Sequence, residues 1–471
     1  MNSFWVRCIL LSFCCVLRAQ QPPWAANLDA FAAESMREQH VPGAAIGIVK
    51  DGKVIYAKGY GVRELKSKQP VTAKTLFAMG SVTKSFTALA VASVIDEGKL
   101  DWDKPVREYL PWFRMFDPVA TELITVRDML THRSGLPRHD FIRFSTHLSR
   151  EELVRRVRYL EPNKTFRDVY QYNNLMFVTA GFLAGHQAGT TWEELVRTRI
   201  YQPVGMTLST TSVVDSQKSA DFARPHSGGE EEKFYVYQTF GVGPNGAVNS
   251  CVDDMLKYLR MWLDGGTAQG RTVISKKQFT ELWRPVTVVN STASYAPGWQ
   301  IGSYRGHASV SHGGSITGFR ANVLLLPQER IGIVAMINDE TGLAGTLTDR
   351  AADLILNLPP APRPGNRTAA SRQRASAQSA EGAPPAKKLE EYAGVYEHPA
   401  YGRVAVRHES GGLSVRFDAL SLNLRHQHYE TFQSSQGPVR FVLNEKGQVA
   451  EMHLPLEAAV KPLVFLKSAK P

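Results

Sequence analysis

The segment from residue 81 to residue 97 constrains the fold most, because it is apolar on nearly every side of a helix. Its apolar members are Phe86, Ala88, Leu89, Ala90, Val91, Ala92, Val94 and Ile95. A helix without a polar face belongs inside a large domain, where neighbouring elements cover it all round. Asp96-Glu97-Gly98 then provides a C-terminal stop. The sequence therefore predicts a buried central helix.

Strand patterns stand at both ends of residues 20–358, with helical patterns between them. Two alternating runs within 44–60 flank Asp51-Gly52, a dipeptide typical of a tight hairpin. The spacing predicts helices over 150–160, 176–187 and 252–264, and successive strands over 298–303, 307–312, 319–327 and 331–337. The simplest packing of this order is an α+β fold, in which helices flank an antiparallel sheet made from both ends of the domain.

The composition changes after Leu358. Residues 359–388 are rich in Pro, Ala, Ser, Gln and Arg and hold almost no large apolar side chain. Such a segment buries too little surface to offset its ordering entropy, so we expect a linker. Short alternating runs resume over 389–471, at 403–406, 413–417, 439–443 and 463–466. They predict a small antiparallel β-barrel or sandwich.

The first 19 residues have the layout of a secretory signal peptide. Arg7 precedes a ten-residue stretch, Cys8 to Leu17, that is apolar except for Ser12, and Ala19 offers a small residue for cleavage. The stretch is too short to cross a bilayer as a helix. We expect a cleaved signal and a secreted or periplasmic protein without stable membrane insertion. An uncleaved membrane anchor is the alternative.

Three of the four cysteines, Cys8, Cys14 and Cys15, lie in this leader. Lipidation at Cys14-Cys15 is a further alternative, although Phe13 stands where a small residue would be needed. Cleavage leaves Cys251, so we expect neither an internal disulfide nor a cysteine-based metal site.

The formal charge of +11 does not indicate nucleic-acid binding once it is mapped. Two positive charges lie in the leader and a net five in 359–388, which leaves +4 for the folded parts. No dense basic stripe interleaved with aromatic residues occurs there. We therefore expect no nucleic-acid partner.

The segment Phe77 to Lys84 carries the chemistry, because Ser81 opens the apolar helix and Lys84 follows three residues later. Positions i and i+3 share a helix face, so the amine can reach the hydroxyl. A serine nucleophile needs an adjacent base, and a lysine serves as one when its pKa is lowered by burial. The alternative is a capping serine beside a solvated lysine. The apolar helix argues against it, since it offers Lys84 no polar face.

Two further segments fit the same chemistry. Tyr172 and Asn174, spaced as Tyr-x-Asn on a loop before a helix, would lie side by side. We expect Lys84 to depress the pKa of the Tyr172 phenol, which relays a proton to the leaving group, and Asn174 to hold Lys84 and a substrate carbonyl. In Ser311 to Ser315, glycines would let a substrate backbone approach, and the Ser315 N–H would join that of Ser81 in an oxyanion hole. Each segment alone is more typical of a polar loop or a strand-end turn than of a site, and it is their occurrence together with Ser81 and Lys84 that favours the site.

With these three motifs in this order, the sequence resembles the serine β-lactamase-like hydrolases. That family includes class C β-lactamases, low-molecular-weight penicillin-binding proteins, D-aminopeptidases and related esterases. The resemblance covers about residues 25–357, and four other segments support it: Val41-Pro42-Gly43, Leu130 to Leu136, Pro203 to Met206 and Gly298-Trp299. We interpret His132, within the second of these, as a loop-fixing residue rather than a base.

The resemblance implies a β-lactamase/transpeptidase-like fold and a set of roles. Ser81 is then the acylated nucleophile, and Lys84 and Tyr172 share the base and acid roles. The substrate-binding residues are Asn174, His312, Gly314 and Ser315. The C-terminal segment resembles the small lipocalin-like barrel found in some D-aminopeptidase-like members.

The third motif departs from the usual pattern, since His312 and Gly313 stand where β-lactamases and penicillin-binding proteins carry Lys and Thr. A neutral histidine and a glycine lack the charge and hydroxyl that suit a substrate carboxylate. We therefore expect D-aminopeptidase- or esterase-like cleavage of small peptide, amide or ester substrates, with no metal or organic cofactor. The alternatives are a β-lactamase or D,D-carboxypeptidase and, in another class, a non-catalytic binding or sensor protein. The sequence assigns no oligomeric state.

Overall fold

The computed structural model describes residues 22–144, 148–228, 230–231, 243–360, 382–409, 412–417 and 420–468. The expected signal peptide at 1–19 lies outside these residues, and so does most of the expected linker at 359–388. Within the described ranges, no helix has both the length and the apolar character needed to cross a membrane.

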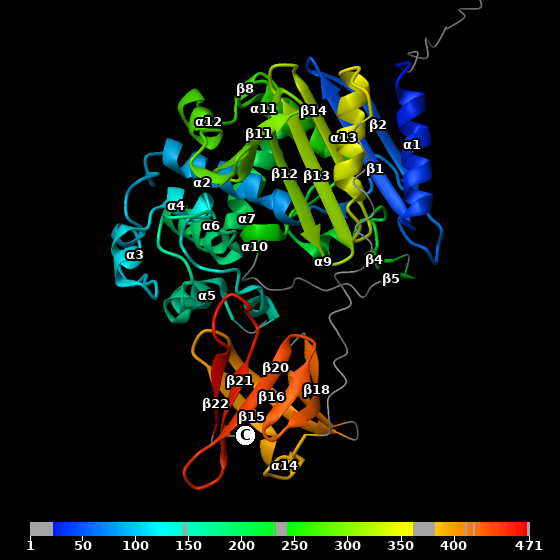
Figure 1. The fold of residues 1–471 in the computed structure, drawn as a ribbon. Coiled ribbons are helices and arrows are strands. Elements are labelled where there is room, and N and C mark those ends of the chain that lie inside the picture. Colours follow the sequence, from blue (N-terminus) through cyan, green and yellow to red (C-terminus); the bar gives the residue numbers. More distant parts are fainter. Residues whose placement is uncertain are drawn as a thin grey trace, which may run out of the picture.

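An eight-stranded antiparallel sheet forms the centre of the first domain, residues 22–358 (Figure 1). Its order is β2-β1-β14-β13-β12-β11-β10-β9. The strands are β1 (Gly43–Lys50), β2 (Lys53–Gly61), β9 (Thr287–Asn290), β10 (Ala293–Ala296), β11 (Trp299–Tyr304), β12 (His307–Ile316), β13 (Phe319–Leu326) and β14 (Ile331–Ile337). The N-terminal hairpin pairs with the last strand, so that Ala44 lies opposite Ile337. The predicted sheet from both ends of the domain is confirmed.

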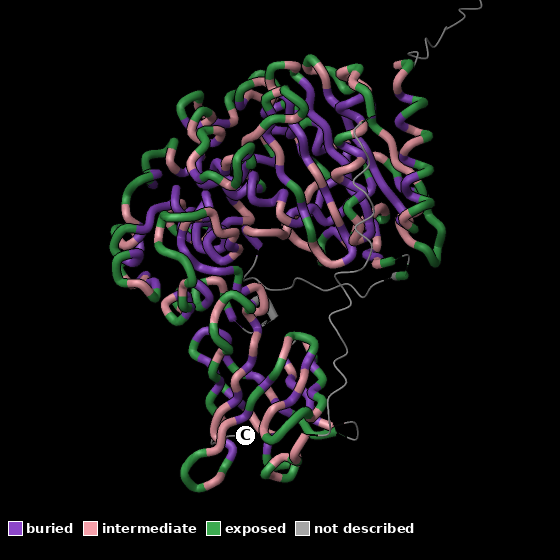
Figure 2. Tube along the Cα trace, in the orientation of Figure 1, coloured by how far each residue is buried: buried purple, intermediate pink, exposed green. Residues whose placement is uncertain are grey.

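Helices cover both faces of this sheet, which explains why β1 is buried along nearly its whole length. Helices α1 (Ala25–Glu38) and α13 (Leu343–Ile355) pack on one face against Ile46 and Ile48. Helix α11 (Val252–Leu263) packs on the other face, where Gly47 lets it approach: a Cβ there would lie 2.6 Å from Val252. Figure 2 shows the resulting buried interior.

The apolar segment becomes helix α2 (Thr83–Asp96), preceded by the single turn η1 (Gly80–Val82). Eleven of its fourteen residues are buried, which confirms the predicted central helix. Phe86 stacks on Tyr258 of α11 with ring centroids 4.0 Å apart. A second apolar helix, α6 (Asn174–Ala188), lies against α2.

The remaining elements of the first domain are short. The helices are η2 (Val106–Glu108), α3 (Pro118–Leu123), α4 (Val126–Leu130), η3 (Asp140–Phe144), α5 (Arg150–Arg156), η4 (Val157–Tyr159), α7 (Trp192–Val196), η5 (Arg197–Tyr201), α8 (Gln202–Val204), α9 (Val213–Ser216), α10 (Gly243–Gly246) and α12 (Lys276–Leu282). Two-residue strands form the pairs β3 (Phe77–Ala78) with β6 (Asn249–Ser250), β4 (His226–Ser227) with β5 (Glu230–Glu231), and β7 (Thr267–Ala268) with β8 (Arg271–Thr272).

The C-terminal residues form a closed antiparallel barrel, which confirms the barrel form of the prediction. After α14 (Leu389–Tyr392), its strands are β15 (Gly394–His398), β16 (Gly402–Glu409), β17 (Gly412–Arg416), β18 (Ser421–His428), β19 (Thr431–Ser434), β20 (Gly437–Leu443), β21 (Val449–Leu454) and β22 (Leu463–Lys467). Pairing of β15 with β22 closes it. Aromatic side chains, among them Tyr396 and Phe441, fill the interior, so the barrel is a packed core.

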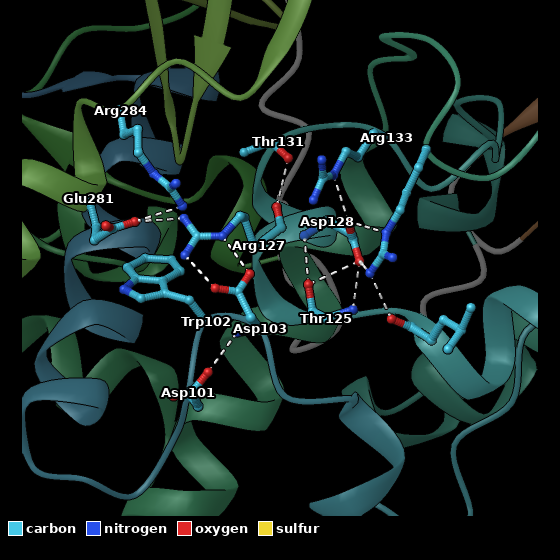
Figure 3. A network of polar contacts seen from close by, with 12 residues as sticks. Asp101, Trp102, Asp103, Thr125, Arg127, Asp128, Thr131, Arg133, Glu281 and Arg284 are labelled. Carbon is cyan, nitrogen blue, oxygen red and sulfur yellow. Dashed lines mark hydrogen bonds and ion pairs between the residues drawn. The ribbon is translucent and has the colours of Figure 1, made fainter.

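A buried carboxylate, that of Asp128 in α4, holds two loops of the first domain together (Figure 3). It accepts hydrogen bonds from Arg133 Nε at 2.6 Å and Arg167 Nη2 at 2.8 Å, and it caps α4 through Thr125. The two loops also join directly, since the Arg167 N–H donates to the Arg133 carbonyl at 2.8 Å. The loop that carries His132 is therefore fixed to the one that leads to Tyr172.

Replacing this carboxylate is expected to destabilise the domain strongly. Asp128→Ala leaves two guanidinium groups without their counter-charge and should lower the free energy of unfolding by about 3–5 kcal/mol. Asp215→Ala, which removes an exposed ion pair with Lys218, is the control and should cost at most about 1 kcal/mol. Urea denaturation followed by tryptophan fluorescence measures both, and equal losses in the two variants contradict the prediction.

Candidate active site

Ser81 lies in η1, between β3 and α2, and its half-buried side chain lines an open cavity of about 300 Å³. The same cavity is lined by Asn174 and Ser315. An adjoining cavity on the β12 side is lined by Ser81 with Tyr172, His312, Gly314 and Ser315. The structure thus brings six of the seven sequence-predicted site residues to the cavity walls. The seventh, Lys84, lies behind Ser81 and is fully buried.

The Lys84 amine has three neighbours. Its Nζ lies 3.1 Å from Ser81 Oγ, 2.8 Å from Asn174 Oδ1 and 2.9 Å from the Asn245 carbonyl. Burial, and next the charge of Arg138, lowers the pKa of Lys84 well below its ordinary 10.5. A neutral amine has two N–H donors and one lone pair. In that neutral form, the two carbonyl oxygens can accept the two N–H groups, and the lone pair then faces the Ser81 hydroxyl.

The position of the Asn245 carbonyl depends on two threonines of α2. The Thr87 hydroxyl donates to the Pro244 carbonyl at 2.6 Å, and Thr83 Oγ1 accepts from the Val248 N–H at 3.0 Å. These bonds hold α10 against the helix that carries Lys84. A backbone acceptor carries no side-chain signature, so no sequence motif marks this contact.

Tyr172 is the second partner of Ser81, and its hydroxyl donates to Ser81 Oγ at 2.6 Å. The expected depression of its pKa is wrong, because burial raises the pKa of the phenol above its ordinary value. Lys84 does not counter this, since a neutral amine exerts no Coulomb attraction on a phenolate. Tyr172 therefore stays protonated and serves as a hydrogen-bond donor.

His132 fixes the loop that carries Tyr172, in agreement with its predicted role as a loop-fixing residue. His132 Nδ1 accepts the Asn173 N–H at 3.0 Å, and its ring lies 4.3 Å from that of Tyr172. Burial lowers the pKa of His132 well below its ordinary value, so the ring is neutral. Asn173 in turn caps α6 by accepting the Met176 N–H, which places Asn174 in the first turn of that helix.

His312 turns its polar atoms toward the protein. Its Nδ1 lies 2.7 Å from the Gly313 carbonyl, which only accepts, so Nδ1 carries the proton and Nε2 accepts from the Tyr295 hydroxyl at 2.8 Å. Burial, with Lys84 nearby, lowers the pKa of His312 to about 3. At position 312, where the usual motif has a lysine, this chain therefore places no positive charge.

Two glycines let η1 and β12 touch. A Cβ on Gly314 would lie 2.0 Å from the Met79 carbonyl oxygen, and one on Gly80 would lie 2.7 Å from the Ser315 nitrogen. Gly80 also has φ of +50°, which side chains disfavour. The absence of both Cβ atoms brings the Ser81 and Ser315 backbones to the same edge of the cavity. Gly298 acts similarly behind the site, because its Cβ would lie 2.6 Å from the Lys84 carbonyl oxygen.

Four charged residues that the motifs do not mark also line the cavity: Arg138, Asp140, Arg320 and Glu340. Arg138 and Asp140 form an ion pair at 2.6 Å, and Arg138 lies over the Tyr172 ring at 4.9 Å. These residues come from segments that folding alone brings to Ser81. In the described part of the chain, no group of three or more His, Cys, Asp or Glu side chains is placed to hold a metal ion.

Two family models match the chain. A model described as Beta-lactamase matches residues 28–358. A model described as Domain of unknown function (DUF3471) matches residues 378–467, the range that contains the barrel.

Curated relatives and solved structures span much of the chain. The unguisins hydrolase ungD' of Aspergillus campestris is 29% identical over 428 residues, covering 80% of this chain and 78% of its own. Protein flp of Staphylococcus aureus is 23% identical and covers 70% and 66%. The octameric penicillin-binding protein homologue from Pyrococcus abyssi aligns with a TM-score of 0.63 at 24% identity, over 94% of this chain and all of that one. The last likeness concerns the fold alone.

The close approach at Gly314 gives a test of the site's geometry. Gly314→Ala forces η1 and β12 apart, so the Ser315 N–H leaves its place beside Ser81, and labelling of Ser81 by a fluorophosphonate should slow about 100-fold or more. Gly313→Ala is the matched control, because its Cβ would meet nothing nearer than Asn322 Oδ1 at 3.6 Å. Labelling rates come from intact-protein mass spectrometry, and similar rates in the two variants contradict the prediction.

Proposed function

The chain belongs to the Beta-lactamase family, and we propose that it is an exported serine hydrolase that cleaves amide or ester bonds of small substrates through an acyl-enzyme on Ser81. One observation carries this proposal. The Ser81 hydroxyl lies between the buried Lys84 amine at 3.1 Å and the Tyr172 hydroxyl at 2.6 Å, at the wall of an open cavity. A nucleophile, a base and a proton donor thus meet at one point.

Acylation begins with proton transfer from Ser81 to Lys84. The neutral amine takes the proton as Ser81 Oγ attacks the substrate carbonyl, and the N–H groups of Ser81 and Ser315 stabilise the oxyanion. Lys84 must be neutral beforehand, so kcat/KM falls as the pH drops below the pKa of Lys84. Since burial lowers that pKa, a larger share of the amine is neutral at any given pH than for an exposed lysine.

Breakdown of the tetrahedral intermediate needs a proton on the leaving group. Tyr172 gives its hydroxyl proton to the leaving nitrogen or oxygen and recovers one from the Lys84 ammonium. Water then attacks the acyl-enzyme and gives a proton to Lys84. The Lys84 ammonium returns that proton to Ser81 Oγ as Ser81 leaves. Each group returns to its starting state, so the cycle consumes only water and substrate.

The substrate class follows from the third motif. The two arginines of the cavity already have partners, Arg138 in Asp140 and Arg320 in the Ile316 and Phe319 carbonyls. Both nitrogens of His312 are engaged within the protein and Gly313 has no hydroxyl, so neither supplies a carboxylate site. This supports D-aminopeptidase- or esterase-like cleavage over β-lactam turnover. Hydrolysis in general is supported by the relative named unguisins hydrolase ungD', because this chain matches 78% of that relative's length.

Loss of the nucleophile should abolish turnover. Ser81→Ala is expected to lower hydrolysis of p-nitrophenyl esters and D-amino-acid p-nitroanilides by about 10³-fold or more, because among the described residues no other hydroxyl lies between Lys84 and Tyr172. Ser93→Ala, on the same helix with its hydroxyl bonded to the Ala90 carbonyl, should keep wild-type rates. An unchanged rate in Ser81→Ala would remove Ser81 from the mechanism. A stable fluorophosphonate adduct on Ser81 without turnover of any substrate would instead indicate a binding or sensor protein.

The neutral third motif makes a separate prediction for β-lactams. Nitrocefin hydrolysis should be at least about 100-fold slower, as kcat/KM, than hydrolysis of the best p-nitrophenyl ester, since position 312 offers the carboxylate no cation. Absorbance assays on the same enzyme batch compare the two. Rapid nitrocefin turnover would overturn this interpretation of His312 and favour the β-lactamase alternative.

A further inference from the structure

We propose that the C-terminal barrel orients the catalytic site through the backbone of His139, so that Glu457 and Tyr401 of the barrel are positioning residues for hydrolysis. The proposal rests on the function proposed for Ser81 and extends it to the second domain. Its path runs from Glu457 to His139 and Asp140, and from there through Asn174 to Lys84.

Two loops at one end of the barrel contact the segment 137–142 of the first domain. Glu457, between β21 and β22, accepts the His139 N–H at 2.8 Å. Tyr401, between β15 and β16, places its hydroxyl 3.0 Å from His139 Nδ1. His139 and Tyr401 are both fully buried, so this is a packed interface. In Figure 1 the red loop between β21 and β22 reaches the first domain beside α5.

The His139 backbone is held in a conformation that it would not choose alone. Its φ is +47°, in the left-handed region that a residue with a Cβ disfavours. The Glu457 carboxylate captures the amide of this same residue. A strained residue persists where its surroundings over-determine it, and here the barrel supplies that constraint.

The residues on either side of His139 lie at the active-site cavity, which His139 itself also lines. Arg138 and Asp140 both line it. Asp140 Oδ1 accepts from Asn174 Nδ2 at 2.7 Å, and Asp140 Oδ2 pairs with Arg138 Nε at 2.6 Å. The conformation of one residue therefore places its own side chain in the barrel interface and the side chains on either side of it at the catalytic centre.

Asp140 decides which end of the Asn174 amide faces Lys84. An ionised carboxylate only accepts, so it must receive the NH₂ group, and this turns Oδ1 toward the Lys84 amine at 2.8 Å. Without Asp140, the amide is free to flip and present N–H groups to an amine whose own two N–H groups need acceptors. The carboxylate thus keeps the Lys84 lone pair directed at Ser81.

The same segment sets the charge around Lys84. Of the groups facing the amine, Arg138 lowers its pKa and Asp140 raises it by less. His132 and His312 are neutral, and Tyr172 is protonated. If the segment moves outward, water reaches the amine and the effect of Arg138 weakens. Both changes raise the pKa of Lys84 toward its ordinary value and shift the acidic limb of kcat/KM to higher pH.

The test removes the barrel's acceptor in the full-length chain. Glu457→Ala should lower kcat for a p-nitrophenyl ester about ten- to hundredfold and move the acidic limb of kcat/KM to higher pH. Glu457→Gln keeps an oxygen that accepts the His139 N–H. This variant should therefore retain most of the wild-type kcat and an acidic limb of kcat/KM close to that of the wild type. Glu451→Ala, which loses a contact between two partly exposed side chains of β21, Glu451 and His453, is the control and should match wild type.

Active-site titration with a fluorophosphonate separates positioning from folding. If Glu457→Ala only unfolds part of the enzyme, fewer active sites react with the fluorophosphonate, and the sites that do react keep the wild-type kcat and pH profile. That result overturns the proposal. The proposal is also overturned if Glu457→Ala has the wild-type kcat and pH profile. The proposed function stands in that case as long as Ser81→Ala is inactive. Activity retained by Ser81→Ala instead defeats the proposed function itself.

Discussion

The site depends on burying one amine, that of Lys84, beside a serine hydroxyl. A buried ammonium is costly, and the protein meets that cost by keeping the group neutral and supplying two carbonyl acceptors, from Asn174 and Asn245. This requirement explains the apolar surroundings of α2, whose side chains exclude water from the amine. It also explains why α6 and α10 must pack directly on α2, since each brings one acceptor. The polar chemistry thus uses an apolar helix as its support.

The backbone contacts around Ser81 place limits on the sequence that side-chain chemistry alone does not reveal. Gly80, Gly314 and Gly298 each stand where a Cβ would strike a backbone atom of a neighbouring segment. These positions join η1 to β12 and α2 to the turn before β11. A serine and a lysine on a helix are common, whereas this set of close backbone approaches is not. The geometry of the nucleophile is therefore encoded as much by missing side chains as by present ones.

Much of the fold could be predicted because its signals are local. The hairpin at Asp51-Gly52, the apolar run of α2 and the successive strands β11 to β14 are each visible within a dozen residues. The site was predictable where a motif lies in one segment, as with Ser81 and Lys84. Asp140 and the Asn245 carbonyl were not, because only tertiary packing brings them to Lys84. The pKa of Tyr172 was predicted in the wrong direction, since burial outweighed the charge expected beside it.

The order of the sheet has a consequence for how the chain acquires its structure. β1 pairs with β14, so Ala44 cannot pair until Ile337 has been synthesised. Helix α2 is likewise synthesised long before β12 and β13, the strands nearest the nucleophile. At typical rates of synthesis the interval is about 15–60 s. During that time the apolar strand β1 lacks its partner β14, and contacts this distant in sequence form slowly. Until the last strands are made, the unpaired edge of β1 exposes apolar surface that favours aggregation.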